Sequence, residues 1–335
     1  LGYKVFAYDP NPGIEHLFLP YFYKEGDNGK EEGSLEDSYK FLTATTRSGV
    51  FDGMISTSWD DSGLHNQMWM LRFAAAAAFS WNGSEPTLGE FRTSFLKNYY
   101  GPNVKDAEEL YQLLNEGAYY YMSTFERKVW HWGVIGKTHL PDLPKGDAIE
   151  YDPYWNQEYE AIIGQSAQMA KKMDRALAII GENETGVRHA YDFAIYKSIA
   201  KLIWHTTQTY KDLSDLETLI TLAHRKHFES HEESYHAMAE AVTLLENSLK
   251  RRETIFNELV ATWEQTRLPK GLSTADKKYF FRQDRARHYA NRVPDISYLI
   301  YDEQQLDMEG YLKALKAYME EYRKMHLTAD RPLRE

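Results

Sequence analysis

The sequence contains no cysteine among its 335 residues. Disulfide bonds, thiolate metal sites and cysteine nucleophiles are therefore excluded, while either redox compartment remains compatible with the chain. Basic residues are also few, because 39 Lys and Arg stand against 50 Asp and Glu and give a formal net charge of −11. Binding to a phosphate backbone requires a basic face, so this balance argues against a nucleic-acid partner.

Long apolar runs are missing as well. The longest one, FAAAAAFSW at residues 73–81, is far shorter than the roughly 20 residues that a membrane-spanning helix needs. We therefore expect no contact with a membrane. No phosphate-binding or dinucleotide-binding glycine motif occurs, and we expect no cofactor. The chain opens with LGYKVFAYDP, without an initiator Met or a signal peptide, and this start leads us to expect a fragment of a longer protein.

Aromatic residues, in contrast, are abundant. They make up 14% of the chain and include 25 Tyr and 8 Trp. Such a content fits contact with carbohydrate, and it also fits a helical array with wide interfaces. Composition alone does not choose between the two.

The first hundred residues alternate strand and helix patterns. YKVFAY, at residues 3–8, is β-branched and aromatic and ends in the turn-forming sequence Asp-Pro-Asn-Pro-Gly. We expect a helix over about 34–49, a second strand over 53–58 and a second helix over about 64–81. This order is typical of βαβ units with parallel strands, so residues 1–100 predict a small α/β region.

Residues 101–335 carry mostly helical patterns, and the predicted fold class is mainly α with a small α/β part. Helices are expected at about 87–101, 104–132, 154–180, 185–212, 214–266, 273–291 and 304–326. KDLSD, at residues 211–215, is expected to separate two of them. The 214–266 pattern is long, and we expect a bend or break near residues 229–233.

Aromatic and acidic residues stand at the ends of both expected strands. Tyr8 and Asp9 end the first strand, and Trp59, Asp60 and Asp61 follow the second. In a parallel α/β barrel, side chains at the carboxyl ends of strands face the active site. An aromatic ring packs on the apolar face of a sugar, and carboxylates accept hydrogen bonds from its hydroxyls. These five residues therefore predict a sugar-binding site.

A purely structural explanation accounts for the same residues. Asp60, Asp61 and Ser62 are good N-cap residues for the helix that follows, and acidic groups in a first turn favour the helix dipole. Trp59 would then be an aromatic residue of the core. The residue pattern by itself leaves both interpretations open.

GVFDGMISTSWDDSGLHNQMWMLRFAAAAAFSWN, at residues 49–82, resembles the last strand and helix of the catalytic barrel in glycoside hydrolase family 20, the β-N-acetylhexosaminidases. The resemblance implies that residues 1–100 are the C-terminal part of a TIM-type (β/α)8 barrel, followed by an α-helical domain at 101–335. It also implies that Trp59 belongs to the sugar-binding wall and that Asp61 binds the 4- and 6-hydroxyls. The family more usually has the longer Glu at this last position, so Asp60 is a second candidate for the contact.

The same family has a Tyr, closely followed by an Asp, at the end of an earlier strand, where the Tyr binds the acetamido group of the substrate. Tyr8 and Asp9 are similar to this pair. The resemblance therefore implies a glycan with a terminal N-acetylhexosamine as the ligand, without a metal or a cofactor. Export to the periplasm or the medium is suggested by the family type alone.

The general acid of the family is absent from this chain. Family members use substrate-assisted hydrolysis, with an Asp-Glu pair that follows two glycines on a middle strand. No such motif occurs here, so the resemblance implies a chain that is inactive alone, with its acid pair upstream. The alternatives are a non-catalytic helical interaction module with a remnant α/β segment, or a barrel hydrolase with another glycan substrate.

A histidine-rich stretch, AHRKHFESHEESYH, contains His224, His227, His231 and His236. The first three have i, i+3 and i+7 spacing, which places them on one face of a helix, and metal sites use such spacings. Lys and Arg are interleaved, however, and the HExxH motif is absent. We therefore favour a solvated or interhelical face over a metal site.

Overall fold

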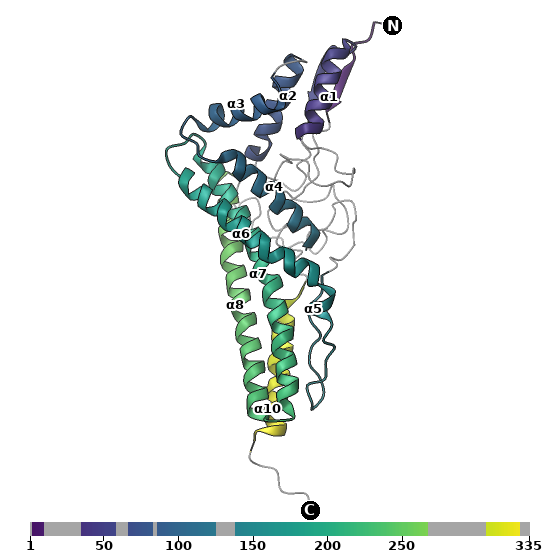
Figure 1. Cartoon of the computed structure of the whole chain (residues 1–335), viewed down its shortest axis with the longest axis vertical. Helices are drawn as coiled ribbons and strands as arrows, with labels where there is room; N and C mark the ends of the chain where they lie inside the picture. Colours follow the sequence, from purple (N-terminus) through teal and green to yellow (C-terminus); the bar gives the residue numbers. More distant parts are fainter. Residues whose placement is uncertain are drawn as a thin grey trace, which may run out of the picture.

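The computed structural model describes residues 2–9, 35–57, 66–82, 86–124, 138–266 and 306–328. Within these ranges helices dominate and are accompanied by one small parallel sheet (Figure 1). The predicted mainly α class with a small α/β part is therefore confirmed. None of the described helices combines the length and the apolar character that crossing a membrane requires.

The sheet and its first helix form a βαβ unit. Its elements are β1 (Phe6–Asp9), α1 (Leu35–Ser48) and β2 (Gly53–Ser56). The strands run parallel, and their register pairs Ala7 with Met54 and Tyr8 with Ile55. Contacts join α1 to β1 and the following helix to β2, so one face of the sheet lies against helices. The predicted order of strand, helix, strand and helix is confirmed.

The next two helices begin differently. A 3-10 turn, η1 (Asn66–Trp69), leads into α2 (Met70–Trp81), so the helix expected over 64–81 starts with a tighter turn. A capping box precedes α3 (Leu88–Tyr100): the Thr87 side chain accepts from the Glu90 amide, and the Glu90 carboxylate accepts from the Thr87 amide. Gly101 closes α3 at the end of the helix expected over 87–101, with a φ of 97° that favours glycine.

The remaining helices are α4 (Ala107–Thr124), α5 (Trp155–Glu158), α6 (Glu160–Asn183), α7 (Ala190–His227), α8 (His231–Glu264) and α10 (Met308–His326). Helices α7, α8 and α10 lie side by side along the lower half of the molecule (Figure 1). The helix expected over 273–291 and the end of the one expected over 104–132 lie outside the described residues.

The connection predicted at KDLSD is wrong, because α7 continues through it. Leu213 and Leu216 are fully buried at helical spacing, and Lys211 forms an i,i+4 ion pair with Asp215. Burial of this apolar stripe outweighs the weak helix propensity of Ser and Asp. The break expected near residues 229–233 is confirmed, since Ser230 caps the start of α8.

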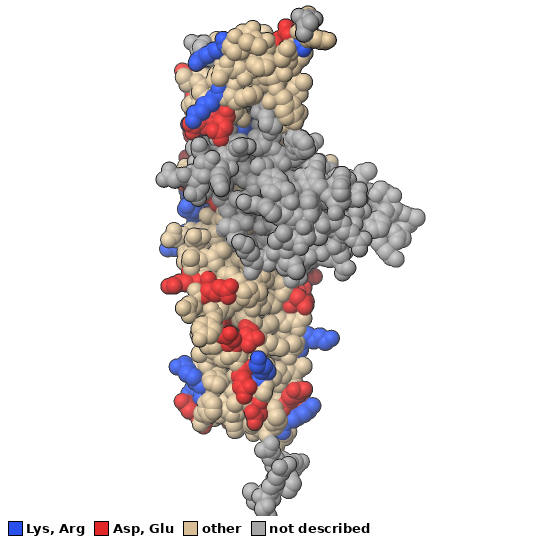
Figure 2. Space-filling model, turned by 90° about the vertical axis from the view of Figure 1, so that its right-hand side faces the viewer, with Lys and Arg blue, Asp and Glu red and all other residues tan. Residues whose placement is uncertain are grey.

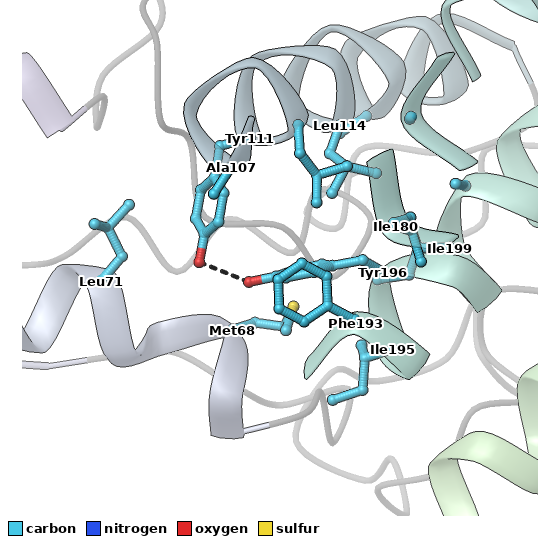
Figure 3. Close-up of a cluster of buried hydrophobic side chains, with 14 of the residues drawn as sticks. Met68, Leu71, Ala107, Tyr111, Leu114, Ile180, Phe193, Ile195, Tyr196 and Ile199 are labelled. Atoms are coloured by element: carbon cyan, nitrogen blue, oxygen red, sulfur yellow. Dashed lines mark hydrogen bonds between the residues drawn. The ribbon is translucent and has the colours of Figure 1, made fainter. Parts of the chain in front are cut away.

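Two hydrophobic cores share the long helices. The first packs α1 to α4 against α6 and against the upper parts of α7 and α8, and it contains residues on both sides of position 100. Figure 3 shows Leu71 of α2, Tyr111 of α4 and Phe193 of α7 within it. The second core lies among α7, α8 and α10, where Leu216, Leu245 and Leu315 are fully buried.

Candidate functional site

The carboxyl ends of β1 and β2 meet at one edge of the sheet, because the strands are parallel. There the Thr57 hydroxyl donates to the hydroxyl of Tyr8 at an oxygen–oxygen distance of 3.0 Å. The Tyr8 side chain is 47% exposed, so much of it is open to a ligand. Of the residues predicted to bind sugar, Tyr8 is therefore held at this edge by Thr57, the last residue described after β2.

The other predicted site residues are described only in part. Asp9 is the last residue of β1 and pairs with Ser56, but its side chain is not among those described. Trp59, Asp60 and Asp61 lie outside the described residues. The structure thus brings Tyr8 and the end of β2 together, and the predicted indole and carboxylates stay predictions.

One face of the sheet, here called the bare face, has no described element packed against it. Ala7 and Met54 form a register pair on the face that lies against the helices, and Ala7 is buried. Phe6, Tyr8 and Ile55 alternate onto the opposite face, where 47 to 51% of each side chain is exposed. Parallel sheets are normally covered on both faces, so this apolar surface is unusual.

Glycine at position 53 shapes this bare face. It pairs with Phe6, and a Cβ placed there would lie 2.6 Å from Cε1 of the Phe6 ring. The absence of a side chain therefore lets the aromatic ring lie across the neighbouring strand. Farther back, the Asp52 carboxylate accepts from the Val5 amide at 2.9 Å, and the Asp52 amide donates to the Val5 carbonyl at 2.7 Å. These contacts fix the register at the start of both strands.

Sequence reasoning missed Thr57 and Asp52, which directly flank β2; the strand expected over 53–58 includes Thr57. A polar residue at each end of a short strand could have indicated hydrogen bonds to the neighbouring strand.

Two polar atoms are buried at the start of the helix that follows the predicted site. The indole N–H of Trp69 and the side-chain oxygen Oε1 of Gln67 have no hydrogen-bond partner within the described structure. Buried polar groups normally have a partner, and leaving one unsatisfied costs about 1–3 kcal/mol. A water or a hydroxylated ligand close to η1 would supply it.

A buried tyrosine cluster joins α3, α4 and α7. The hydroxyls of Tyr100, Tyr111 and Tyr196 form a closed triangle with oxygen–oxygen distances of 2.7, 2.7 and 3.0 Å. Figure 3 shows the hydroxyls of Tyr111 and Tyr196 pointing toward each other. Each hydroxyl has one proton to donate and can also accept, so every hydroxyl has at least one hydrogen-bond partner within the cluster. Burial raises the pKa of each phenol well above its ordinary value.

Asp192 lies beside this triangle, with Oδ2 at 3.4 Å from the Tyr100 hydroxyl. Burial raises the pKa of its carboxyl from 3.8 to about 6, and hydrogen bonds from Tyr99 and Tyr100 partly offset the effect. The three tyrosines of the triangle and Asp192 are buried, so none of these four groups is open to a substrate. We therefore interpret the cluster as a structural hydrogen-bond network that holds α3, α4 and α7 together. In the sequence, only the high tyrosine content indicated it.

The histidine stretch divides between two environments. His227 and His231 lie between helices, as favoured from the sequence, whereas Nδ1 of His224 contacts the carbonyl of Ala148 in the loop before α5; each of the three Nδ1 atoms has a partner within 3.2 Å. His236 instead lines an open groove of about 610 Å³ between α7 and α8. No group of His, Asp or Glu among the described residues is arranged to hold a metal ion.

The groove beside His236 has an apolar floor that includes Leu219 and Leu244, with Asp215 and Glu240 among its lining residues. On the face of the molecule that Figure 2 shows, acidic and basic side chains are interspersed along the helices. This mixture is typical of a solvated helical surface.

Comparison of the chain with models of protein families, with curated proteins and with solved structures found no match.

Proposed function

We propose that this chain supplies part of the sugar-binding wall of a retaining exo-β-N-acetylhexosaminidase-like glycoside hydrolase, similar to family 20. The observation that carries the proposal is the hydrogen bond between Tyr8 and Thr57, which joins the carboxyl ends of two parallel strands. This edge is where α/β barrels bind their ligands. The aromatic and acidic residues at 59–61 directly follow it in the chain.

The two faces of the sheet support a barrel origin. A barrel strand turns one side toward the surrounding helices and the other toward the barrel interior. Ala7 and Met54 lie on the helix side, and Phe6, Tyr8 and Ile55 lie on the bare side. In the proposed parent enzyme, further strands would cover this bare side and both open edges of the sheet.

Each proposed site residue has a role in binding the terminal sugar. Trp59 packs against the apolar face of the ring, and Asp61, with Asp60 as the second candidate, accepts bonds from the 4- and 6-hydroxyls. Tyr8, close to Asp9, donates to the acetamido oxygen and so orients it toward the anomeric carbon. The Asp-Glu pair that protonates the leaving group comes from outside this chain, which we propose is inactive alone.

Binding of methyl N-acetyl-β-glucosaminide tests this proposal, followed through chemical-shift changes of the chain. Trp59→Ala should weaken binding by about fivefold or more, because stacking on an aromatic ring contributes about 1 kcal/mol. Trp81→Ala is the matched control, since Trp81 is 91% exposed at the end of α2. Equal binding by the two variants would contradict the assigned sugar wall.

The second candidate is a non-catalytic helical interaction module that keeps a remnant α/β segment. The observation that favours it is the helical character of the chain, since both hydrophobic cores consist mainly of helix residues. A folded chain that binds no N-acetylhexosaminide, either alone or when completed by a barrel domain, would favour this candidate.

A further inference from the structure

Three imidazole rings and one phenol meet at the end of the bundle where α7 turns into α8. His227 comes from α7, His231 from α8, and Tyr322 and His326 from α10. The ring centroids of His231 and His326 are 4.5 Å apart, and that of His227 is 4.8 Å from His231 and 5.2 Å from His326. The contact therefore joins three helices through three titratable rings.

The hydrogen bonds of the cluster fit neutral imidazoles. Tyr322 is fully buried, and its hydroxyl lies 2.9 Å from Nδ1 of His227 and 3.2 Å from Nδ1 of His231. A phenol donates one bond, and the Tyr322 hydroxyl also has a hydrogen bond with the Ser234 side chain, so at least one of the two rings donates to it. An imidazolium has no acceptor nitrogen, so a ring that accepts from the phenol does so in its neutral form.

Further contacts extend the cluster to the loop before α5. Nε2 of His326 lies 3.1 Å from the carbonyl of Asp147, and Nδ1 of His224 lies 2.9 Å from the carbonyl of Ala148. The Tyr318 hydroxyl donates to the carbonyl of Gly146 at 3.0 Å. The loop, residues 138–154, is thus held through side chains of α7 and α10 that include two histidines.

The titratable groups around His227 provide little compensation for a positive charge on its ring. The titratable groups that act on it come from α7, α8, α10 and the loop and are His224, His231, His326 and Asp147. The only carboxylate among them, that of Asp147, is exposed to solvent. Lys226, the next residue on α7, is paired with Glu229 and Glu233.

We propose that His227, His231 and His326 form an acid-sensitive clasp. In the neutral state they hold the end of α10 and the loop 138–154 against the turn between α7 and α8. Uptake of protons places like charges on rings about 5 Å apart and releases α10 and the loop from the turn. The clasp lies at the opposite end of the molecule from the sheet (Figure 1) and works independently of sugar binding.

The direction of the pH effect follows from His227. Burial lowers its pKa from the ordinary 6.5, and repulsion from His231 and His326 lowers it further, while Asp147 raises it. The closed state therefore favours the neutral ring. Closure is complete above pH 6.5 and is lost as the pH falls through the lowered pKa.

Hydrogen exchange of the whole chain, followed by mass spectrometry at about pH 7.5 and about pH 5.5, tests the clasp. After correction for the intrinsic rate, amides at the end of α10 and in the loop should lose about tenfold or more of their protection at the lower pH. The double variant H231Q/H326Q should show no such loss. His236→Gln is the matched control, because His236 lies on α8 outside the cluster, and it should respond like the parent chain.

Two results would overturn the clasp. One is a parent chain whose protection at these sites does not change with pH, and the other is a double variant that loses as much protection as the parent. If the double variant lacks protection at α10 and the loop at both pH values, an NMR titration of the histidines in the parent chain decides whether the clasp exists. His227 titrating at or above its ordinary pKa of 6.5 would then refute the proposal.

Discussion

Tyr8 and Thr57 are 49 positions apart in the chain, yet their hydroxyls share a hydrogen bond at the carboxyl edge of the sheet. The bond joins the penultimate residue of β1 to the residue that follows β2. The two strand ends are thus linked at the edge where the residues with the proposed sugar contacts follow in the sequence.

Tyr8→Phe tests the ligand contact at this edge. It should weaken binding of an N-acetylhexosaminide by about threefold to tenfold, because one hydrogen bond contributes about 0.5–1.5 kcal/mol. Thr57→Val is the control, since it removes the same intramolecular bond but keeps the Tyr8 hydroxyl. Chemical-shift titration measures both affinities. If Thr57→Val weakened binding as much as Tyr8→Phe, the hydroxyl of Tyr8 would have no direct role.

Asp192 provides a prediction about pH. Its carboxyl is 2% exposed and has a pKa raised by burial to about 6, so the ionised form destabilises the fold above that pH. The folded state binds the proton more tightly than the unfolded state, and the penalty falls as the pH drops toward 3.8. Asp192→Asn removes the penalty. The variant should therefore be more stable than the parent, and this gain in the free energy of unfolding should be about 2 kcal/mol larger at pH 7.5 than at pH 4.5.

Urea unfolding of both proteins at both pH values measures this difference. The histidine clasp is present in parent and variant alike, so its own pH dependence cancels. A difference between the two proteins that stays constant with pH would show that Asp192 is ionised equally in the folded and unfolded states.

Arg251 of α8 connects to two groups of α7. Its Nη2 donates to Oδ2 of Asp212 at 2.6 Å, and its Nε donates to Nδ1 of the buried His205 at 3.2 Å. Arg251→Met leaves the carboxylate of Asp212 buried without its cation, so the free energy of unfolding should fall by about 3 kcal/mol. Arg323→Met is the control: its exposed partner Glu320 lies on the same helix, and the loss should stay below about 1 kcal/mol. Similar losses in urea unfolding would refute the special role of Arg251.

Two helical glycines should respond oppositely to a methyl group. Nothing lies within 4 Å of a Cβ added at Gly164 of α6, so Gly164→Ala should raise the free energy of unfolding by about 0.5–1 kcal/mol. At Gly117 of α4 the new Cβ would lie 2.9 Å from Cδ1 of Ile203 and 3.0 Å from Cε of Met173. Gly117→Ala should therefore gain nothing or destabilise the protein. Thermal unfolding of the pair measures the contrast, and equal gains would mean that this helix crossing is loosely packed.

Local signals in the sequence predicted much of the fold. The turn chemistry after Tyr8, the capping residues Thr87 and Glu90, and Gly101 each mark an element end that the structure has. Capping and turn preferences act within a few residues, so they can be recognised without knowledge of the partners. The βαβ order followed from the alternating strand and helix patterns of residues 3–81.

Long-range partners could not be predicted in the same way. Residues 211–215 look like a connection, and only burial of Leu213 against other helices makes them helical. His326 lies far from the histidine stretch in the chain, so its place beside His227 depends on how α10 packs. The tyrosine triangle likewise draws one residue from each of three helices. In the candidate site, the pairing of strand ends was predictable, whereas the bond from Thr57 to Tyr8 was not.

Helix α7 has one further consequence. Its 38 residues span about 57 Å without interruption, and its buried side chains contribute to both cores. Unfolding of α7 would remove buried side chains from both cores. A calorimeter should therefore record one cooperative unfolding endotherm instead of two separate ones. Because α7 belongs to both cores, the sheet end and the histidine end of the molecule should unfold in the same transition.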